Sequence, residues 1–130
     1  MAFLNALGSV SRHGQWRLRR VLRARLPDGR LDLSDAGLID FSTASEVLLT
    51  VTPRPPLGPR CAERCEHVPR PVLSASMSGG TLLVSNPGII EALFPVGWAT
   101  AVPRGFCDVR ILMTVGPETA CIFEQPVELR

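Results

Sequence analysis

Prolines and glycines are spread along this chain so densely that they limit it to short elements of secondary structure. The 130 residues include twelve prolines and eleven glycines. Proline breaks helices because it lacks a backbone N–H, and glycine permits the backbone angles of tight turns. The segments between them alternate apolar with polar residues or are rich in β-branched residues. This pattern predicts about seven or eight short strands in an antiparallel sandwich or barrel.

The predicted strands follow from alternation and from turn residues. Residues 16–26 place Trp16 and Leu18 on one face and arginines on the other. Arg20 and Val21 break the alternation, which predicts a bulge or a change of face there. Residues 89–93 fit either a helical turn or a strand, and the Ser-Gly-Gly sequence at residues 78–80 predicts a hairpin turn. The other predicted strands cover residues 31–33, 47–52, 72–77, 81–85 and 106–113, and a last strand runs through residues 120–123 and on to residues 127–129.

The chain is predicted to form one domain with two additional segments. A hydrophobic content of 45% is sufficient for a core. We expect residues 1–13 to be an N-terminal arm, either a short helix or an extended strap, and residues 14–130 to be the sandwich. Six prolines surround Cys61 and Cys65 within residues 53–71, which predicts a long surface loop or a displaced edge.

The charge of the chain is unevenly distributed. Residues 1–27 hold six arginines and no acidic residue, whereas the remainder holds eight arginines and all twelve acidic residues, for a net charge of −4. Four of the arginines lie on one face of the first predicted strand: Arg17, Arg19, Arg23 and Arg25. We interpret them first as a partner interface, second as a solvated face, and third as a phosphate-binding face. Aromatic residues make up only 5% of the chain, and no stacking platform is interleaved with these arginines, which argues against nucleic acid.

Few residues are suited to catalysis. The chain has two histidines, His13 and His67, and its sequence contains no nucleophile elbow, phosphate-binding glycine loop or His-Glu-x-x-His motif. Four aspartates lie near one another in a stretch where Asp favours turns and helix caps: Asp28, Asp32, Asp35 and Asp40. The sequence therefore predicts a protein that is not an enzyme and has no catalytic residues.

The cysteines are compatible with either a zinc site or free thiols. Cys61, Cys65 and His67 lie within seven residues, and Cys107 or Cys121 could complete a set of four ligands. However, the Cys-x3-Cys spacing departs from the usual Cys-x2-Cys, and a single residue separates Cys65 from His67. We therefore expect neither a metal nor another cofactor. In a chain without an export signal, free thiols are expected rather than disulfides.

No segment has the pattern of a membrane span or a secretory signal. No apolar run approaches the roughly 18 residues that a membrane helix needs, and no apolar core follows a charged start. The basic, acid-free residues 1–27 resemble a mitochondrial transit peptide, but the strand periodicity of residues 16–26 opposes that interpretation. We expect a protein that stays in the cytosol where it is made.

The order of several segments adds a family resemblance. A Gly-x-Trp start precedes an Asp-Gly turn, a Leu-Asp-Leu-Ser segment, a Val-Leu-Leu-Thr-Val strand and a Gly-Gly-Thr-Leu-Leu-Val segment with a Pro-Gly after it. Residues 102–105, Val-Pro-Arg-Gly, lead into residues 106–111, Phe-Cys-Asp-Val-Arg-Ile. Over residues 14–129 this order resembles the immunoglobulin-like N-terminal domain of upper baseplate proteins and similar tail-associated modules of bacteriophages. The chain departs from that pattern in its loop at residues 53–71, which resembles an insertion, and at residues 106 and 107, where the family often has tyrosine.

The resemblance implies an all-β, immunoglobulin-like antiparallel sandwich with a structural role. We expect a component of a bacteriophage or phage-derived particle, assembled in the host cytoplasm and located at the tail or baseplate. Its expected partners are other virion tail or baseplate proteins and copies of itself in a ring, without nucleic acid or membrane. The expected partner interface consists of Phe3, Leu4 and Leu7 in the arm together with Arg17, Arg19, Arg23 and Arg25. The alternative is a small nucleic-acid-binding or zinc-containing accessory module.

Overall fold

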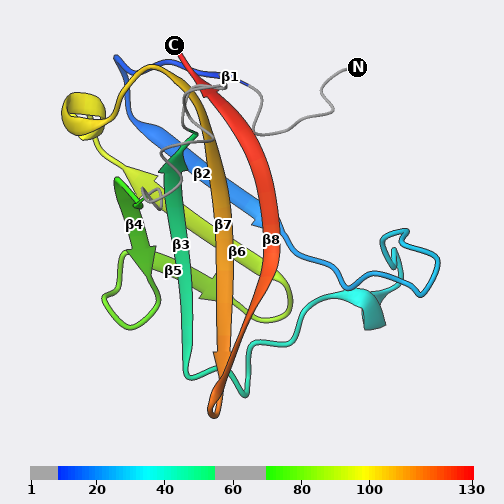
Figure 1. The fold of residues 1–130 in the computed structure, drawn as a ribbon. Coiled ribbons are helices and arrows are strands. Elements are labelled where there is room, and N and C mark those ends of the chain that lie inside the picture. Colours follow the sequence, from blue (N-terminus) through cyan, green and yellow to red (C-terminus); the bar gives the residue numbers. More distant parts are fainter. Residues whose placement is uncertain (1–8, 55–69) are drawn as a thin grey trace, which may run out of the picture.

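Two β-sheets pack face to face in the computed structural model, which describes residues 9–54 and 70–130 (Figure 1). The strands are β1 (Ser9–Val10), β2 (Trp16–Val21), β3 (Glu46–Pro53), β4 (Leu73–Ser76), β5 (Leu82–Ser85), β6 (Ile89–Phe94), β7 (Gly105–Val115) and β8 (Glu118–Leu129). Two short 3-10 helices lie in connections between strands, η2 (Asp35–Gly37) and η3 (Trp98–Ala101).

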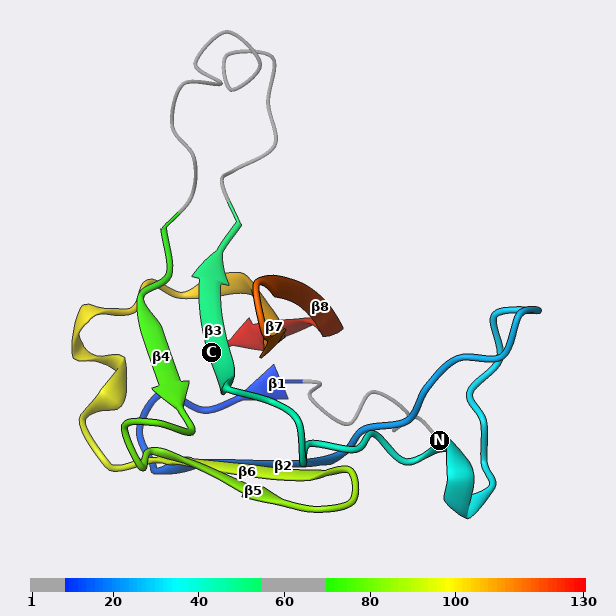
Figure 2. The same ribbon diagram turned by 90° about the horizontal axis from the view of Figure 1, so that it is seen from below.

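The order of the strands defines the class of fold. One sheet has the order β1-β8-β7-β3-β4 and the other has the order β2-β6-β5, and Figure 2 shows them as two layers. The pairs are antiparallel except for β1 and β8, which run parallel with Ser9 opposite Glu128. The runs β8-β7-β3-β4 and β2-β6-β5 correspond to strands G-F-C-C′ and B-E-D of immunoglobulin domains. The chain is thus an immunoglobulin-like β-sandwich, and the predicted fold class is confirmed.

Strands β7 and β8 are longer than the sequence predicts. They have 11 and 12 residues and form one hairpin in which Val115 lies opposite Glu118. The last strand continues through residues 124–126 as predicted, although this segment contains a proline. Pro126 lies opposite Asp108 on a strand near the edge of the sheet, where a missing N–H is tolerated.

Strand β2 is shorter than the predicted strand at residues 16–26. It ends at Val21, and the N–H of Leu22 donates to the carbonyl oxygen of Gly88 at 2.6 Å. Residues 22–45, called here the projecting loop, then extend away from both sheets before β3 begins (Figures 1 and 2). The predicted strand over residues 16–26 therefore ends at Val21, where the alternation breaks, and its extension over residues 22–26 was wrong.

The projecting loop folds back on itself near its base. Arg23 and Arg25 form single antiparallel bridges with Leu38 and Leu31, respectively. The predicted strand at residues 31–33 is therefore reduced to one bridging residue. Two backbone hydrogen bonds of Ala24 replace a regular sheet partner: its N–H donates to Gly37 O at 2.7 Å, and its carbonyl oxygen accepts from Asp32 N at 2.9 Å. The loop base is thus held by its own backbone.

Two other predicted elements have different outcomes. Residues 89–93, for which a helical turn and a strand were both open, belong to strand β6 at the centre of the smaller sheet. The Ser-Gly-Gly segment at residues 78–80 does not form a hairpin, because it connects β4 in one sheet to β5 in the other. A turn signal in the sequence does not specify whether the next strand pairs with the previous one.

Aliphatic and aromatic side chains from both sheets form the core. Val47, Leu49 and Ile111 of the larger sheet are fully buried, as is Ile90 of the smaller sheet. At one end of the sandwich, Trp16 packs its ring against Phe94 and Trp98, with ring-centroid distances of 5.5 and 5.2 Å. The Trp98 indole Nε1–H donates to the carbonyl oxygen of Gly14 at 2.8 Å, which satisfies its polar group.

Replacement of Gly88 by alanine is expected to destabilise the junction between β6 and the projecting loop. Gly88 has a φ of +79°, and an added Cβ would lie 3.0 Å from Leu22 O and 3.1 Å from Leu38 Cδ2. The backbone conformation and the close contacts together should lower the free energy of unfolding by about 2–3 kcal/mol in urea denaturation. Gly80→Ala is the matched control, because Gly80 has a φ of +76° with nothing within 4 Å of the added Cβ. Equal losses in the two variants would contradict the close packing at Gly88.

Candidate docking surfaces

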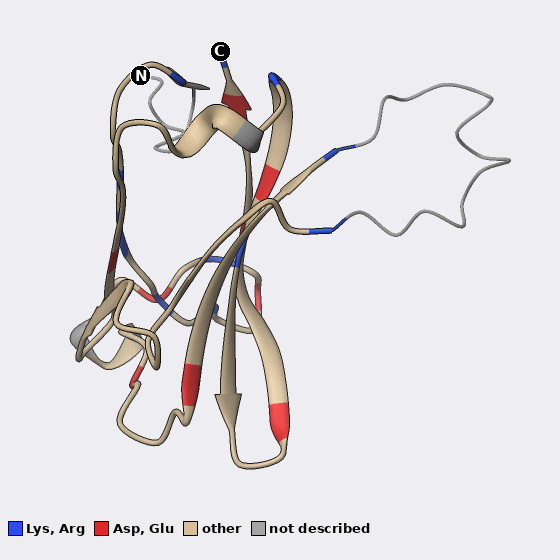
Figure 3. Ribbon diagram, turned by 90° about the vertical axis from the view of Figure 1, so that its left-hand side faces the viewer, with Lys and Arg blue, Asp and Glu red and all other residues tan. Residues whose placement is uncertain are grey.

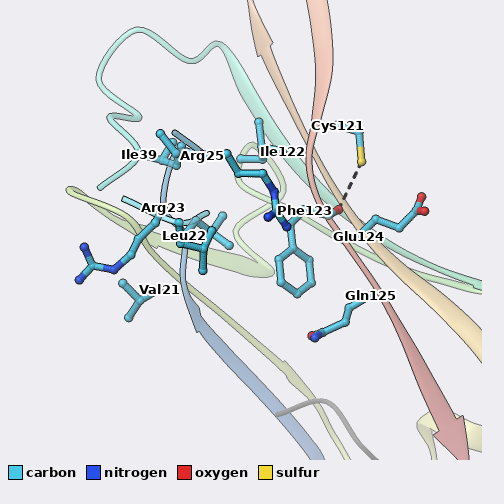
Figure 4. A pocket seen from close by; sticks show the side chains of 12 residues that line it. Val21, Leu22, Arg23, Arg25, Ile39, Cys121, Ile122, Phe123, Glu124 and Gln125 are labelled. Carbon is cyan, nitrogen blue, oxygen red and sulfur yellow. Dashed lines mark hydrogen bonds between the residues drawn. The ribbon is translucent and has the colours of Figure 1, made fainter. Parts of the chain in front are cut away.

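A groove of about 450 Å³ lies between strand β8 and the base of the projecting loop (Figure 4). Its volume falls within the range of about 300–1,000 Å³ that is usual for ligand and peptide pockets. One wall comes from the end of β2 and the projecting loop, namely Val21, Leu22, Arg23, Ala24, Arg25, Leu31 and Ile39. The other wall comes from β8, namely Cys121, Ile122, Phe123, Glu124 and Gln125.

A β-bulge in β8 gives the groove its apolar wall. Ile111 of β7 lies opposite Phe123 and the next residue, Leu112, lies opposite Cys121, so Ile122 is the extra residue on β8. Two consecutive side chains can face one side of a sheet at such a bulge. Figure 4 shows Ile122 and Phe123 on the groove side of β8, whereas Cys121 and Glu124 lie on its other side. Both groove-facing side chains are half-buried.

The arginines of the groove bind the backbone of the projecting loop. Arg23 Nη1 donates to the carbonyl oxygens of Asp32 at 3.2 Å and Ser34 at 3.0 Å. Arg25 Nη1 donates to the carbonyl oxygen of Gly29 at 2.8 Å. These hydrogen bonds satisfy part of each guanidinium but leave its positive charge without a carboxylate contact in the described residues.

A second surface lies on the solvent side of the smaller sheet. We call it the outer patch, and it consists of Arg17, Arg19, Val21, Leu83 and Leu93. Arg17 lies opposite Leu93 on β6, and Leu83 on β5 lies opposite Glu91. Leu83 and Leu93 remain 61% and 53% exposed, and Val21 is 45% exposed. Apolar side chains are therefore interleaved with arginines on this face.

Glu91 partly neutralises the outer patch. Its Oε1 atom lies 2.9 Å from Arg17 Nη2, and its Oε2 atom lies 3.9 Å from Arg19 Nε. Exposed ion pairs of this kind contribute at most about 1 kcal/mol, so both arginines can exchange this partner for another carboxylate at little cost. Figure 3 shows that basic residues (blue) and acidic residues (red) both occur along the strands of the sandwich.

The four arginines predicted to share one face are divided between the two surfaces. Arg17 and Arg19 belong to the outer patch, whereas Arg23 and Arg25 line the groove. The division arises because β2 ends at Val21, after which alternation no longer follows a single sheet face. Sequence reasoning missed the groove itself. Its one signal in the sequence was the consecutive apolar pair Ile122 and Phe123 within an otherwise alternating strand.

Several predicted site residues lie outside the described residues. These are Phe3, Leu4 and Leu7 of the arm, and Cys61, Cys65 and His67 of the possible zinc set. Within residues 9–54 and 70–130, no three His, Cys, Asp or Glu side chains are grouped closely enough to hold a metal ion. No helix in these same ranges is long and apolar enough to cross a membrane.

The chain is an immunoglobulin-like sandwich with two candidate docking surfaces. No family model matches the chain, and no curated protein matches it either.

The Asp32 carboxylate holds the projecting loop in a pH-dependent way. Its Oδ1 atom accepts hydrogen bonds from Ser34 Oγ at 2.6 Å and Ser34 N at 3.0 Å. These bonds, with a further contribution from the charge of Arg23, lower the pKa of Asp32. Because the pKa is lower in the folded state, the ionised group stabilises the loop above the ordinary Asp pKa of about 4, and this contribution is lost as the pH falls through the lowered value.

We expect Ser34→Ala to raise the pKa of Asp32 toward its ordinary value, since it removes the hydroxyl donor. An NMR titration of the Asp32 carboxyl carbon measures the shift directly. Ser42→Ala is the matched control, because the N–H of Ser42 bonds to Asp40 and not to Asp32. An unchanged Asp32 titration in Ser34→Ala would show that the hydroxyl does not hold this carboxylate.

Proposed function

We propose that the chain is a structural subunit of a bacteriophage or phage-derived particle, at the tail or baseplate, and that it acts by docking on neighbouring subunits. The observation that carries the proposal is the outer patch, where exposed leucines alternate with arginines on a rigid sheet. The resemblance of residues 14–129 to tail-associated modules supports the choice of particle. The predicted arm contacts of Phe3, Leu4 and Leu7 belong to the same proposal.

The composition of the outer patch suits an interface between proteins. Arginine is enriched at such interfaces, and exposed apolar patches rimmed by polar residues mark sites of protein interaction. Burying Leu83 and Leu93, which are 61% and 53% exposed, contributes about 1–2 kcal/mol each. Arg17 and Arg19 add directional contacts to carboxylates of a neighbour. Docking thus combines apolar burial with charge complementarity on one face.

The test replaces the apolar part of the outer patch. In a double variant, Leu83→Asp with Leu93→Asp, we expect the number of copies per purified particle to fall by about tenfold or more, because two charges replace the apolar contact. The isolated double variant should keep the thermal stability of the wild type, since both side chains face solvent. Val96→Asp is the matched control, because Val96 is 72% exposed but lies outside the sheet. Normal incorporation of a folded double variant would refute docking through this patch.

A further inference from the structure

Among residues 9–54 and 70–130, the sandwich has an open side where two strand edges lack partners. Strand β8 is an outer strand along most of its length in these ranges, because β1 pairs only with Glu128 and Leu129. Strand β2 is the outer strand of the smaller sheet, with β6 as its one partner in the described part of the chain. Free strand edges present unpaired N–H and C=O groups that readily pair with another strand.

The groove lies between these two edges and offers side-chain contacts to an added strand. A strand placed beside β8 would direct alternate side chains into the groove, toward Phe123 and Ile122. The opposite wall adds Leu22, which is buried, and Ile39, which is half-buried. An added strand with apolar residues at its groove-facing positions would therefore cover the apolar wall of β8.

The positive charges near the groove favour an added strand that carries a carboxylate as well as apolar side chains. Arg20 lies two residues after Leu18 on β2, at a position that alternation assigns to the same inward face as Trp16 and Leu18. The Arg20 side chain is half-buried. Its Nη1 atom donates to Arg19 O at 2.7 Å, whereas its buried Nε has no hydrogen-bond partner among the described residues. Arg23 and Arg25 line the groove itself. The acidic residue of the lining, Glu124, is paired with Arg110 on β7.

We propose that this open side accepts an extended strand from a partner protein, which pairs with the free edge of β8 and carries apolar residues and a carboxylate on its groove-facing side. The carboxylate meets arginines beside the groove that are in no ion pair among the described residues, and the apolar residues cover Ile122 and Phe123. The inference rests on the proposed function, because it names the kind of segment that a neighbouring subunit supplies. It concerns a different surface from the outer patch.

Two synthetic peptides test the proposal with the full chain. The first is the capped heptapeptide Thr-Val-Thr-Glu-Thr-Val-Thr, whose alternate side chains are Val, Glu and Val in either direction. The second has Lys in place of Glu and is the matched control. In NMR titrations we expect the Glu peptide to bind about tenfold more tightly than the Lys peptide and to shift the amide signals of residues 120–125. Equal binding of the two peptides, or shifts confined to β5 and β6, would overturn the proposal.

Variants of the chain locate the binding. Phe123→Asp should abolish binding of the Glu peptide, whereas Leu83→Asp on the outer patch should leave it unchanged. If Phe123→Asp fails to fold, Arg20→Gln provides the second test, because it should reduce the preference for Glu over Lys without removing an apolar contact. If the folded Arg20→Gln variant binds both peptides beside β8 and still prefers the Glu peptide about tenfold, the contact between Arg20 and the Glu side chain is refuted.

Other occupants of the groove would be distinguished by the same titrations. If the full chain binds neither peptide but a Phe3→Asp, Leu7→Asp double variant binds both, the occupant is the chain's own N-terminal segment and the proposal fails. If the free chain is a dimer that the peptide dissociates, the occupant is a second copy and the proposal also fails. Neither result affects the incorporation test of the outer patch, so the two proposals fail separately.

Discussion

Replacing Trp16 with alanine should lower the free energy of unfolding by about 4 kcal/mol, because large buried aromatic side chains cost about 3–5 kcal/mol when truncated. Trp16 is only 5% exposed and contacts both Phe94 and Trp98 at the end of the sandwich. Its loss would leave a cavity between β2, β6 and η3 and would remove two aromatic contacts. Equilibrium denaturation in urea, followed by circular dichroism, measures the change.

The control for this prediction is Phe106→Ala on β7. Phe106 is also aromatic but is 55% exposed, so its truncation should cost less than about 1 kcal/mol. A loss below about 1 kcal/mol for Trp16→Ala, measured against this control, would mean that the aromatic cluster does not stabilise this end of the sandwich.

Cys107 and Cys121 should differ by about 1,000-fold or more in their rate of alkylation, because a buried thiol reacts only when the protein opens. Cys107 on β7 is 1% exposed, whereas Cys121 on β8 is exposed. Burial, with a smaller contribution from Asp108, raises the pKa of Cys107, so little reactive thiolate is present near neutral pH. Iodoacetamide treatment of the native chain followed by peptide mass mapping resolves each site.

In the same experiment, both thiols should react at similar rates after denaturation in guanidinium chloride. This unfolded sample controls for any intrinsic difference between the two sequence contexts. Rapid alkylation of Cys107 in the native protein would contradict the placement of β7 with its thiol in the core. It would also question the register in which Cys107 lies opposite Val127.

Local pattern was sufficient for much of the fold. Alternation in residues 106–113 predicts a half-buried strand because Cys107, Val109 and Ile111 face the core, and these residues lie in β7. Turn residues also marked the connection between β7 and β8. Glycine is favoured where φ is positive, as it is at Gly116. The resemblance supplied the immunoglobulin-like order, which periodicity alone left open between a sandwich and a barrel.

The pairing of strands and the docking surfaces depended on contacts between distant residues. Leu22 still faces the core, and its N–H bonds to Gly88 O, 66 positions further along the chain. The chain leaves β6 only after this contact, which no local pattern contains. For the same reason Arg17 and Arg23 were placed on one face although they belong to different surfaces. The Ile122 bulge depends on the register between β7 and β8, which the sequence of β8 alone does not fix.

The proposal that the chain is a structural subunit of a phage particle is tested most directly by peptide mass spectrometry on density-purified particles from the producing host. Copies of the chain are counted against the tail-tube protein of the same particles. We expect recovery at a fixed multiple of three or six per particle, as for a ring at the tail or baseplate. Absence of the chain from intact particles would contradict it.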